Sequence, residues 1–231
     1  MDEIKRNARI AGLLYLLIAI AGPFNLIYVP GKLLVRGDAI QTVGNILAHQ
    51  SLYRIDLAVG LVSNIIFLFV ALALYRLFKE VNQPLAAVMA VLVMVQIPQG
   101  YVTQLLQFGT LELARGADYL SVLDTTQRNG LAMLCLNLSY KASVFSEIFW
   151  GIWLFPLGVL VIRSGFIPRF LGFWLLANGA AYVALSLVGL LLPQMADLLN
   201  KILFPVLFGE LAFLLWLLVV GAKPRLAAKT A

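Results

Sequence analysis

Residues 55–77, IDLAVGLVSNIIFLFVALALYRL, decide the fold class of this 231-residue chain. Their two charged residues, Asp56 and Arg76, stand next to the two ends, so the 19 residues between them carry no charge. A helix needs roughly 20 apolar residues to cross a hydrocarbon core of about 30 Å. The stretch therefore predicts a transmembrane helix.

Five further stretches have a similar length and composition. The chain is 62% hydrophobic and only 12% charged, with a mean hydropathy of +0.94, which is far from the usage of soluble proteins. We therefore expect an all-α, polytopic integral membrane bundle that forms one transmembrane domain over residues 1–231. The predicted spans are residues 8–29, 55–77, 85–108, 142–162, 170–192 and 202–220, and the external segments are residues 30–54 and 109–141.

The net charge of +6 reflects membrane orientation and does not indicate nucleic-acid binding. Basic residues concentrate on the side predicted to be cytoplasmic, which gives that side a net charge of about +7 and leaves about −1 elsewhere. The sequence thus predicts both termini in the cytoplasm, a location in the cell (plasma or inner) membrane, and membrane lipids as partners. The ten basic residues assigned to the cytoplasmic side are Lys5, Arg6, Arg9, Arg76, Lys79, Arg163, Arg169, Lys223, Arg225 and Lys229.

The first span has two interpretations. Basic residues precede an apolar stretch, and Ala19-Ile20-Ala21 resembles a signal-peptide cleavage site. We favour an uncleaved anchor, because residues 24–29 (FNLIYV) extend the apolar run to spanning length. Cleavage would leave five spans and an external N-terminus.

Two short amphipathic helices are expected outside the membrane. Asp38, with Gln41 three residues later, forms a capping pattern in front of Ile40, Val43, Ile46 and Leu47, which share a helical face. Asp124 and Gln127 repeat the capping pattern, and we expect the helix that begins there to continue into the fourth span.

The order and spacing of several motifs resemble a bacterial membrane-protein family known as domain of unknown function 4386. The motifs are ARIAGLLYLLI (8–18), KLLVRGDA (32–39) with NILA (45–48), ALYRLFKEVN (73–82), GADYLS (116–121) and FPLGVLVIRSGFIPRFLG (155–172). The resemblance covers nearly the whole chain. It implies a compact multi-span protein and carries no established activity, substrate or catalytic residue.

Polar side chains recur at helical spacing inside several predicted spans. Because polar groups are costly in hydrocarbon, they are expected to face the bundle interior or water. Most lie in the outer half of the membrane or at its middle, which predicts a polar pocket open to the outside above an apolar floor. The residues assigned to this pocket are Asn64, Gln96, Gln99, Thr103, Gln107, Ser143, Glu147, Asn178, Tyr182 and Glu210.

Each of these residues also has a simpler interpretation. Glu147 lies about 9 Å along the helix from Lys141, so its side chain can reach the outer interface. The glutamines can join helices without any ligand. Glu210 must be paired, hydrated or protonated at the bilayer centre, where a charge costs roughly 2.5 to 3.5 kcal/mol. Cys135 and His49 are the only residues of their kinds, so the sequence predicts no metal site and no cofactor.

Three functions remain open. The first is the binding or movement of a small or amphipathic ligand through the polar pocket. The second is a structural or regulatory role without a ligand, in which the polar residues only specify helix packing. The third, and the least supported, is an intramembrane enzyme with Glu147 or Glu210 as general acid or base. The sequence shows no nucleophile with an adjacent base beside them, so the catalytic residues stay unknown.

Overall fold

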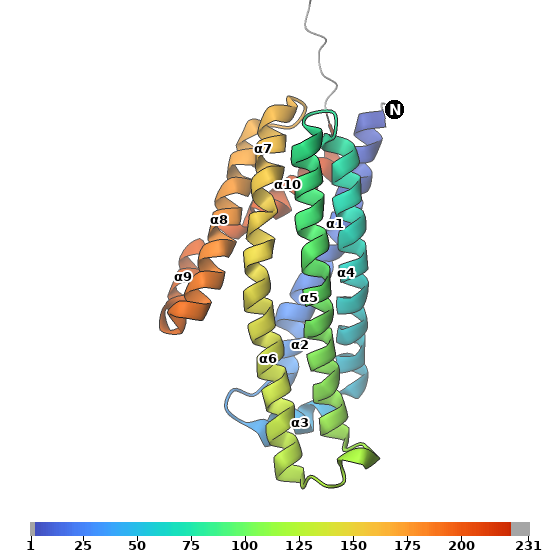
Figure 1. The fold of residues 1–231 in the computed structure, drawn as a ribbon, viewed down its shortest axis with the longest axis vertical. Helices are drawn as coiled ribbons and strands as arrows, with labels where there is room; N and C mark the ends of the chain where they lie inside the picture. The colour runs from blue at the N-terminus through green and yellow to red at the C-terminus, as the bar shows by residue number, and fades with distance from the viewer. Residues whose placement is uncertain (1–2, 223–231) are drawn as a thin grey trace, which may run out of the picture. The chain divides into compact units, whose positions relative to one another are not determined.

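The structure of the protein is a computed structural model that describes residues 3–222, and helices make up its regular structure (Figure 1). A π-helical segment (Phe24–Tyr28) joins α1 to α2, and short 3₁₀ turns cover Asp118–Leu120, Pro193–Met195 and Val206–Phe208. The α-helices are α1 (Glu3–Pro23), α2 (Val29–Leu33), α3 (Ala39–Ala48), α4 (Gln50–Phe78), α5 (Gln83–Arg115), α6 (Thr125–Ile152), α7 (Leu154–Ser164), α8 (Arg169–Leu191), α9 (Ala196–Leu203) and α10 (Gly209–Val219).

Five helical stretches of the described chain are long and apolar enough to cross a membrane. A sixth results if the helices on either side of a 56° bend, Pro193–Leu203 and Val206–Val219, are counted as one span. The predicted all-α, multi-span membrane fold is therefore confirmed. The five continuous stretches are Glu3–Leu33, Gln50–Phe78, Gln83–Arg115, Thr125–Ser164 and Arg169–Leu191.

The sixth predicted span, residues 202–220, is wrong as a single continuous helix. The chain instead breaks between α9 and α10. Pro205 explains the break, because proline lacks an amide hydrogen and its ring clashes with the carbonyl four residues earlier. With 11 residues, α10 is only about 17 Å long, roughly half the thickness of a hydrocarbon core.

The helix of the fourth predicted span begins at Thr125, directly after Asp124, as the capping pattern predicted. The Asp124 carboxylate accepts a hydrogen bond from the Gln127 amide (2.8 Å), and the Gln127 side chain accepts one from the Asp124 amide (3.0 Å). This reciprocal capping box starts α6. The helix then runs on through α7, with a local distortion at Trp153, whose amide lies 3.4 Å from the Phe149 carbonyl. Pro156 accounts for the distortion because it cannot donate to the carbonyl of Ile152.

The short helix α3 is also confirmed, although its buried face differs from the predicted one. The Asp38 carboxylate accepts a hydrogen bond from the Gln41 amide at 2.8 Å, as the capping pattern predicted. Val43 and Ile46 are buried, whereas Ile40 is 74% exposed. Only two of the four residues on the predicted apolar face are therefore buried.

Contacts divide the chain into two compact units, which are described separately. Unit 1 consists of Met1–Leu17, Ile66–Gln96 and Val144–Ala231, and unit 2 of Ile18–Ile65 and Ile97–Ser143. The assignment of one domain to residues 1–231 stays a prediction. The basic residues Lys223, Arg225 and Lys229, which contribute to the predicted charge asymmetry, lie outside the described residues.

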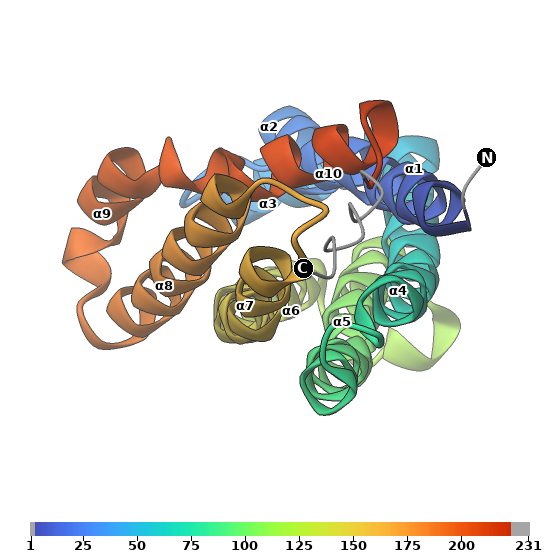
Figure 2. The same ribbon diagram turned by 90° about the horizontal axis from the view of Figure 1, so that it is seen from above.

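Unit 1 is organised around the close pair α7 and α8, which lie side by side in both views (Figures 1 and 2). Glycines permit the approach: a Cβ atom on Gly158 would lie 2.8 Å from the backbone oxygen of Gly172. Small residues at helix contacts are the usual means of close packing in membranes. Leu154, Leu157 and Leu160 of α7 are fully buried in this unit.

Unit 2 has a core of its own, formed by α2, α3 and the parts of α4 and α5 that belong to it. Its buried residues are Val29, Leu33, Ile46, Tyr53, Leu57 and Leu111. The Tyr53 hydroxyl donates a hydrogen bond to the Gln107 backbone carbonyl at 3.0 Å, which joins α4 to α5. The short helix α3 is therefore part of a packed structure.

The packing of α7 on α8 leads to a stability prediction. Gly158→Ala should lower the melting temperature in detergent, by an amount that corresponds to about 1 to 3 kcal/mol, because the new methyl group overlaps the Gly172 backbone. Gly44→Ala is the matched control, since no atom lies within 4 Å of the added carbon. Equal melting temperatures for the two variants would contradict the observed packing.

Candidate functional site

The break between α9 and α10 is held by side chains of α8. The Trp174 indole N–H donates to the Val206 carbonyl at 3.0 Å, and the Asn178 amide donates to the Leu207 carbonyl at 3.3 Å. The Val206 carbonyl also accepts a hydrogen bond from the Gly209 amide across the 3₁₀ turn. Irregular backbone in hydrocarbon must be satisfied by protein groups, because water is absent there. The side chains of α8 therefore stabilise an irregular backbone segment. Such a segment would be unfavourable if it faced lipid.

Glu210 lies in the first turn of α10, directly after this break. Its carboxylate accepts a hydrogen bond from the hydroxyl of Tyr15, which comes from α1. The Tyr182 side chain of α8 also interacts with the carboxylate. A negative charge is favoured at the N-terminal end of a helix, where the amide dipoles leave partial positive charge. Three separate helices thus position one acidic group.

The two tyrosines that contact this carboxylate pack against further aromatic rings. The ring of Tyr15 lies 6.1 Å from that of Trp153, and the ring of Trp153 meets Phe67 edge to face at 5.4 Å. Tyr182 makes an edge-to-face contact with Trp150 at 5.9 Å. Glu147 is a second acidic group near the Tyr182 hydroxyl. We call Tyr15, Glu147, Trp150, Tyr182 and Glu210 the Glu210 cluster.

The contact between α1 and α10 extends beyond the Tyr15–Glu210 hydrogen bond. A Cβ atom on Gly12 would lie 2.7 Å from the backbone nitrogen of Leu218, so the two backbones approach closely at this point. The Arg9 guanidinium donates to the Val219 carbonyl at 3.4 Å, near the C-terminal end of α10. A cation is favoured at that end of a helix. Contacts at both ends of α10 therefore attach it to α1.

The acidic groups of the Glu210 cluster lack a basic partner in the described part of the chain. The ion pairs found there join Lys79 to Glu80 (3.8 Å) and Arg115 to Glu112 (3.6 Å). Glu147 and Glu210 are both partly exposed. A carboxylate that contacts aromatic side chains and has no cation of its own is chemically suited to bind a positively charged group.

The ten residues assigned to the polar pocket divide equally between the two units. Glu147, Tyr182 and Glu210 come together in the Glu210 cluster, and Asn178 lies one helical turn from Tyr182. Gln96, which is only 6% exposed, has no hydrogen-bond partner within residues 3–222 for either side-chain amide atom. A single outward-facing pocket of all ten residues stays a prediction. The members in unit 1 are Gln96, Glu147, Asn178, Tyr182 and Glu210, and those in unit 2 are Asn64, Gln99, Thr103, Gln107 and Ser143.

The polar residues of unit 2 mainly bond to the backbone. The Gln99 amide of α5 donates to the Ala142 carbonyl of α6 at 3.1 Å and so joins the two helices. Asn64, Thr103 and Ser143 each donate to the carbonyl four residues earlier in their own helix. These bonds satisfy the side chains without a ligand. They agree with the simpler interpretation, in which polar residues within the spans hold the helices together.

Two residues of interest lie outside the predicted polar pocket. Tyr15 stands alone in an apolar span, and only the fold reveals that it meets Glu210, 195 positions later. Asp56, near the start of the second predicted span, is 3% exposed. Its spacing of four residues from Gly60, which continues to Asn64, places all three on one helical face, although only Asn64 was assigned to the pocket.

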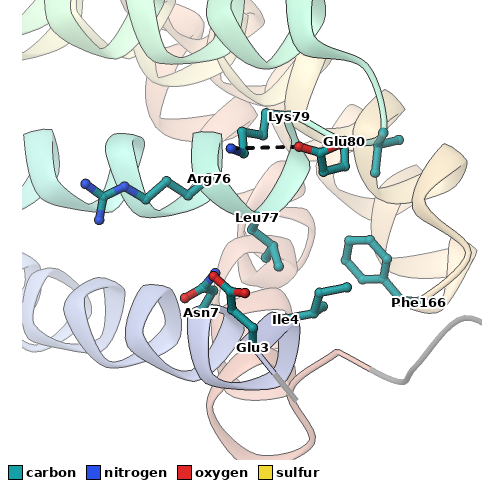
Figure 3. Close-up of a pocket in the computed structure, with 9 residues that line it drawn as sticks. Glu3, Ile4, Asn7, Arg76, Leu77, Lys79, Glu80 and Phe166 are labelled. Atoms are coloured by element: carbon teal, nitrogen blue, oxygen red, sulfur yellow. Dashed lines mark ion pairs between the residues drawn. The ribbon is translucent and has the colours of Figure 1, made fainter.

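A cavity of about 400 Å³ lies in unit 1, away from the predicted site (Figure 3). It opens between the start of α1, the end of α4 and the turn that follows α7. Its lining combines acidic, basic and apolar side chains and includes none of the ten predicted site residues. The lining residues are Glu3, Ile4, Asn7, Arg76, Leu77, Lys79, Glu80, Val81 and Phe166.

Comparison with known proteins decides the family. Residues 10–221 match the family described as Domain of unknown function (DUF4386). The chain belongs to this family. The resemblance seen in the sequence motifs is thereby confirmed. A DUF4386 assignment brings no catalytic or binding residue with it, so the arrangement of the Glu210 cluster has to be interpreted on its own chemistry.

One curated relative of this DUF4386 protein is an uncharacterized protein from Archaeoglobus fulgidus, 32% identical over 88 residues. The match covers 38% of this chain and 51% of the relative, so the chain spans about half the length of the protein it matches. No solved structure gave a significant match. Within residues 3–222, no three His, Cys, Asp or Glu side chains are grouped so as to share a metal ion.

Proposed function

We propose that this protein binds a small amphipathic molecule with a cationic group, and that Glu210 is the carboxylate that contacts the cation. The supporting observation is the state of Glu210: a partly exposed acidic side chain within a membrane-spanning region, next to a helix break, without a basic partner among the described residues. Intramembrane acidic residues of this kind commonly mark ligand or ion sites.

Aromatic side chains favour a cation over a neutral ligand. The faces of tyrosine and tryptophan attract positive charge, with a gain of roughly 0.5 to 2 kcal/mol for each contact. Tyr182, which interacts with Glu210, makes an edge-to-face contact with Trp150, and Glu147 supplies further negative charge near Tyr182. An ammonium group at Glu210 would lie near the side chains of Tyr15 and Tyr182.

The surroundings of Glu210 on α10 favour an amphipathic ligand. Phe208 and Leu211, which flank Glu210, are 43% and 38% exposed. A ligand that arrives from the lipid phase would place its apolar part against these side chains and its charged group at the carboxylate. Discontinuous helices also place binding sites at their breaks in many membrane transporters. Binding is proposed here ahead of transport, because the inner halves of the spans are apolar and offer no polar route onward.

A structural role without a ligand is the second candidate. It is favoured by Asn64, Gln99, Thr103 and Ser143, whose side chains all donate hydrogen bonds to backbone carbonyls of the helices. The two functions differ in what Glu210 does. In a purely structural role, replacement of its charge changes stability and leaves no ligand-specific effect.

Native mass spectrometry of the protein released from lipid nanodiscs tests the proposed function. Wild-type protein should carry a co-purifying cationic amphiphile, and Glu210→Gln, which removes the charge and keeps the shape, should lose it. Glu112→Gln is the matched control, since it removes a carboxylate that forms an ion pair elsewhere. Absence of any bound species from wild type, or its retention by Glu210→Gln, would favour the structural role.

We also propose that the protein resides in the cell membrane with both termini in the cytoplasm, and that membrane lipids contact the cavity shown in Figure 3. The distribution of basic residues supports this orientation. The cavity lining combines the basic Arg76 and Lys79 and the acidic Glu3 and Glu80 with apolar side chains, and Lys79 pairs with Glu80. Charged groups beside apolar surface suit the headgroup region of a phospholipid.

Cysteine labelling tests the orientation. In a Cys135→Ala background, a membrane-impermeant maleimide should label Ser121→Cys on intact spheroplasts, because the turn after α5 is predicted to be external. Glu80→Cys, in the turn between α4 and α5, should be labelled only after lysis. Both positions are exposed in the structure. The opposite labelling pattern would overturn the proposed orientation.

A further inference from the structure

Unit 2 contains a buried acidic residue that the proposed function does not use. Asp56 of α4 is 3% exposed, and no described residue donates a hydrogen bond to its carboxylate or forms an ion pair with it. Buried charges in proteins are normally paired or bound to a metal ion. The missing partner is thus an observation that requires an explanation.

Three other side-chain oxygen atoms in unit 2 also lack a hydrogen-bond donor within residues 3–222. The side-chain oxygens of Asn25, Gln104 and Gln107 are buried and have no donor among the described residues. An amide or carboxylate oxygen without a donor is a free ligand atom for a cation. All four groups offer oxygen, which hard cations prefer over nitrogen or sulfur.

Contacts between α4 and α5 place these groups near one another. Gly60 of α4 packs against the Gln104 side chain of α5, and Gly100 of α5 packs against the Asn64 side chain of α4. The two helices are antiparallel here, so a position four residues earlier on α4 faces a position four residues later on α5. Asp56 lies one further turn along the same face of α4. It therefore faces the turn of α5 that follows Gln104 and contains Gln107.

Asn25 approaches from the N-terminal helical stretch. Its amide nitrogen donates to the backbone carbonyl of Asp56 at 3.1 Å, which brings the Asn25 side chain next to this residue. Asn25 lies in the π-helical segment Phe24–Tyr28. Local π-helical turns within α-helices frequently occur at functional sites, because they redirect a side chain out of its regular position.

We propose that Asp56, Asn25, Gln104 and Gln107 form a binding site for a monovalent metal cation of the Na⁺ class. One carboxylate neutralises the single charge, and the three amide oxygens replace water molecules of the hydration shell. Sequence reasoning expected no metal site because it considered cysteine and histidine ligands, whereas this site consists of oxygen ligands. The ligand and the unit are distinct from those of the Glu210 cluster.

The test measures thermal unfolding of the purified wild-type protein while NaCl replaces N-methylglucamine chloride at constant ionic strength. A ligand that binds only the folded state raises the melting temperature, by about 5 °C or more at 100 times its Kd in a protein of this size. A saturable rise with Na⁺ is expected. Equal melting temperatures in the two salts would overturn the proposal.

Two variants assign the effect to the site. Asp56→Asn should abolish the response to Na⁺. Gln104→Met, which keeps the volume and removes one oxygen ligand, should require an about tenfold higher Na⁺ concentration for half of the effect. Glu112→Gln is the control and should respond as the wild type does.

The variants also define the results that contradict the site. A wild-type response retained in both Asp56→Asn and Gln104→Met would show that Na⁺ acts elsewhere. Stabilisation by acid alone, without any response to Na⁺, would identify Asp56 as a protonated side chain and exclude the metal site. If Asp56→Asn does not fold, the wild-type titration and Gln104→Met still decide between these outcomes.

Discussion

The hydrogen bond from the Tyr15 hydroxyl to the Glu210 carboxylate is the interaction on which the proposed site depends. It joins the first transmembrane helix to the last described one, across 195 positions of sequence. Close packing at Gly12 and the bond from Arg9 to the end of α10 fix the same pair of helices at other points. Together they place an acidic group within the membrane-spanning part of unit 1, where an unpaired charge is otherwise unfavourable.

The break before α10 is the second constraint, and it follows from Pro205. A bilayer provides no water for irregular backbone, so protein groups must bond to it. Trp174 and Asn178 of α8 donate to the Val206 and Leu207 carbonyls in this segment. The same break places Glu210 in the first turn of a helix, where the amide dipoles favour its charge. Backbone geometry and site chemistry are therefore linked through one proline.

Sequence patterns predicted the helices well and their contacts poorly. Long apolar runs define spans because the bilayer imposes a length, and the Asp38 and Asp124 caps follow from local hydrogen bonding. Glu210 and Tyr182 were identified because polar residues in spans are rare. Tyr15 and Asp56 were left out of the predicted pocket, because their surroundings depend on helix rotation and on partners far away in sequence. Pro205 was present in the sixth span, but the apolar pattern on both sides of it concealed the break.

A double-mutant cycle across Tyr15 and Glu210 tests the central interaction most directly. Thermal or chemical unfolding of wild type, Tyr15→Phe, Glu210→Met and the double variant in detergent gives the coupling free energy between the two side chains. We expect a favourable coupling of about 1 kcal/mol, in the range found for hydrogen bonds within membrane proteins. Additive effects, with a coupling near zero, would contradict the role of this hydrogen bond in positioning the carboxylate.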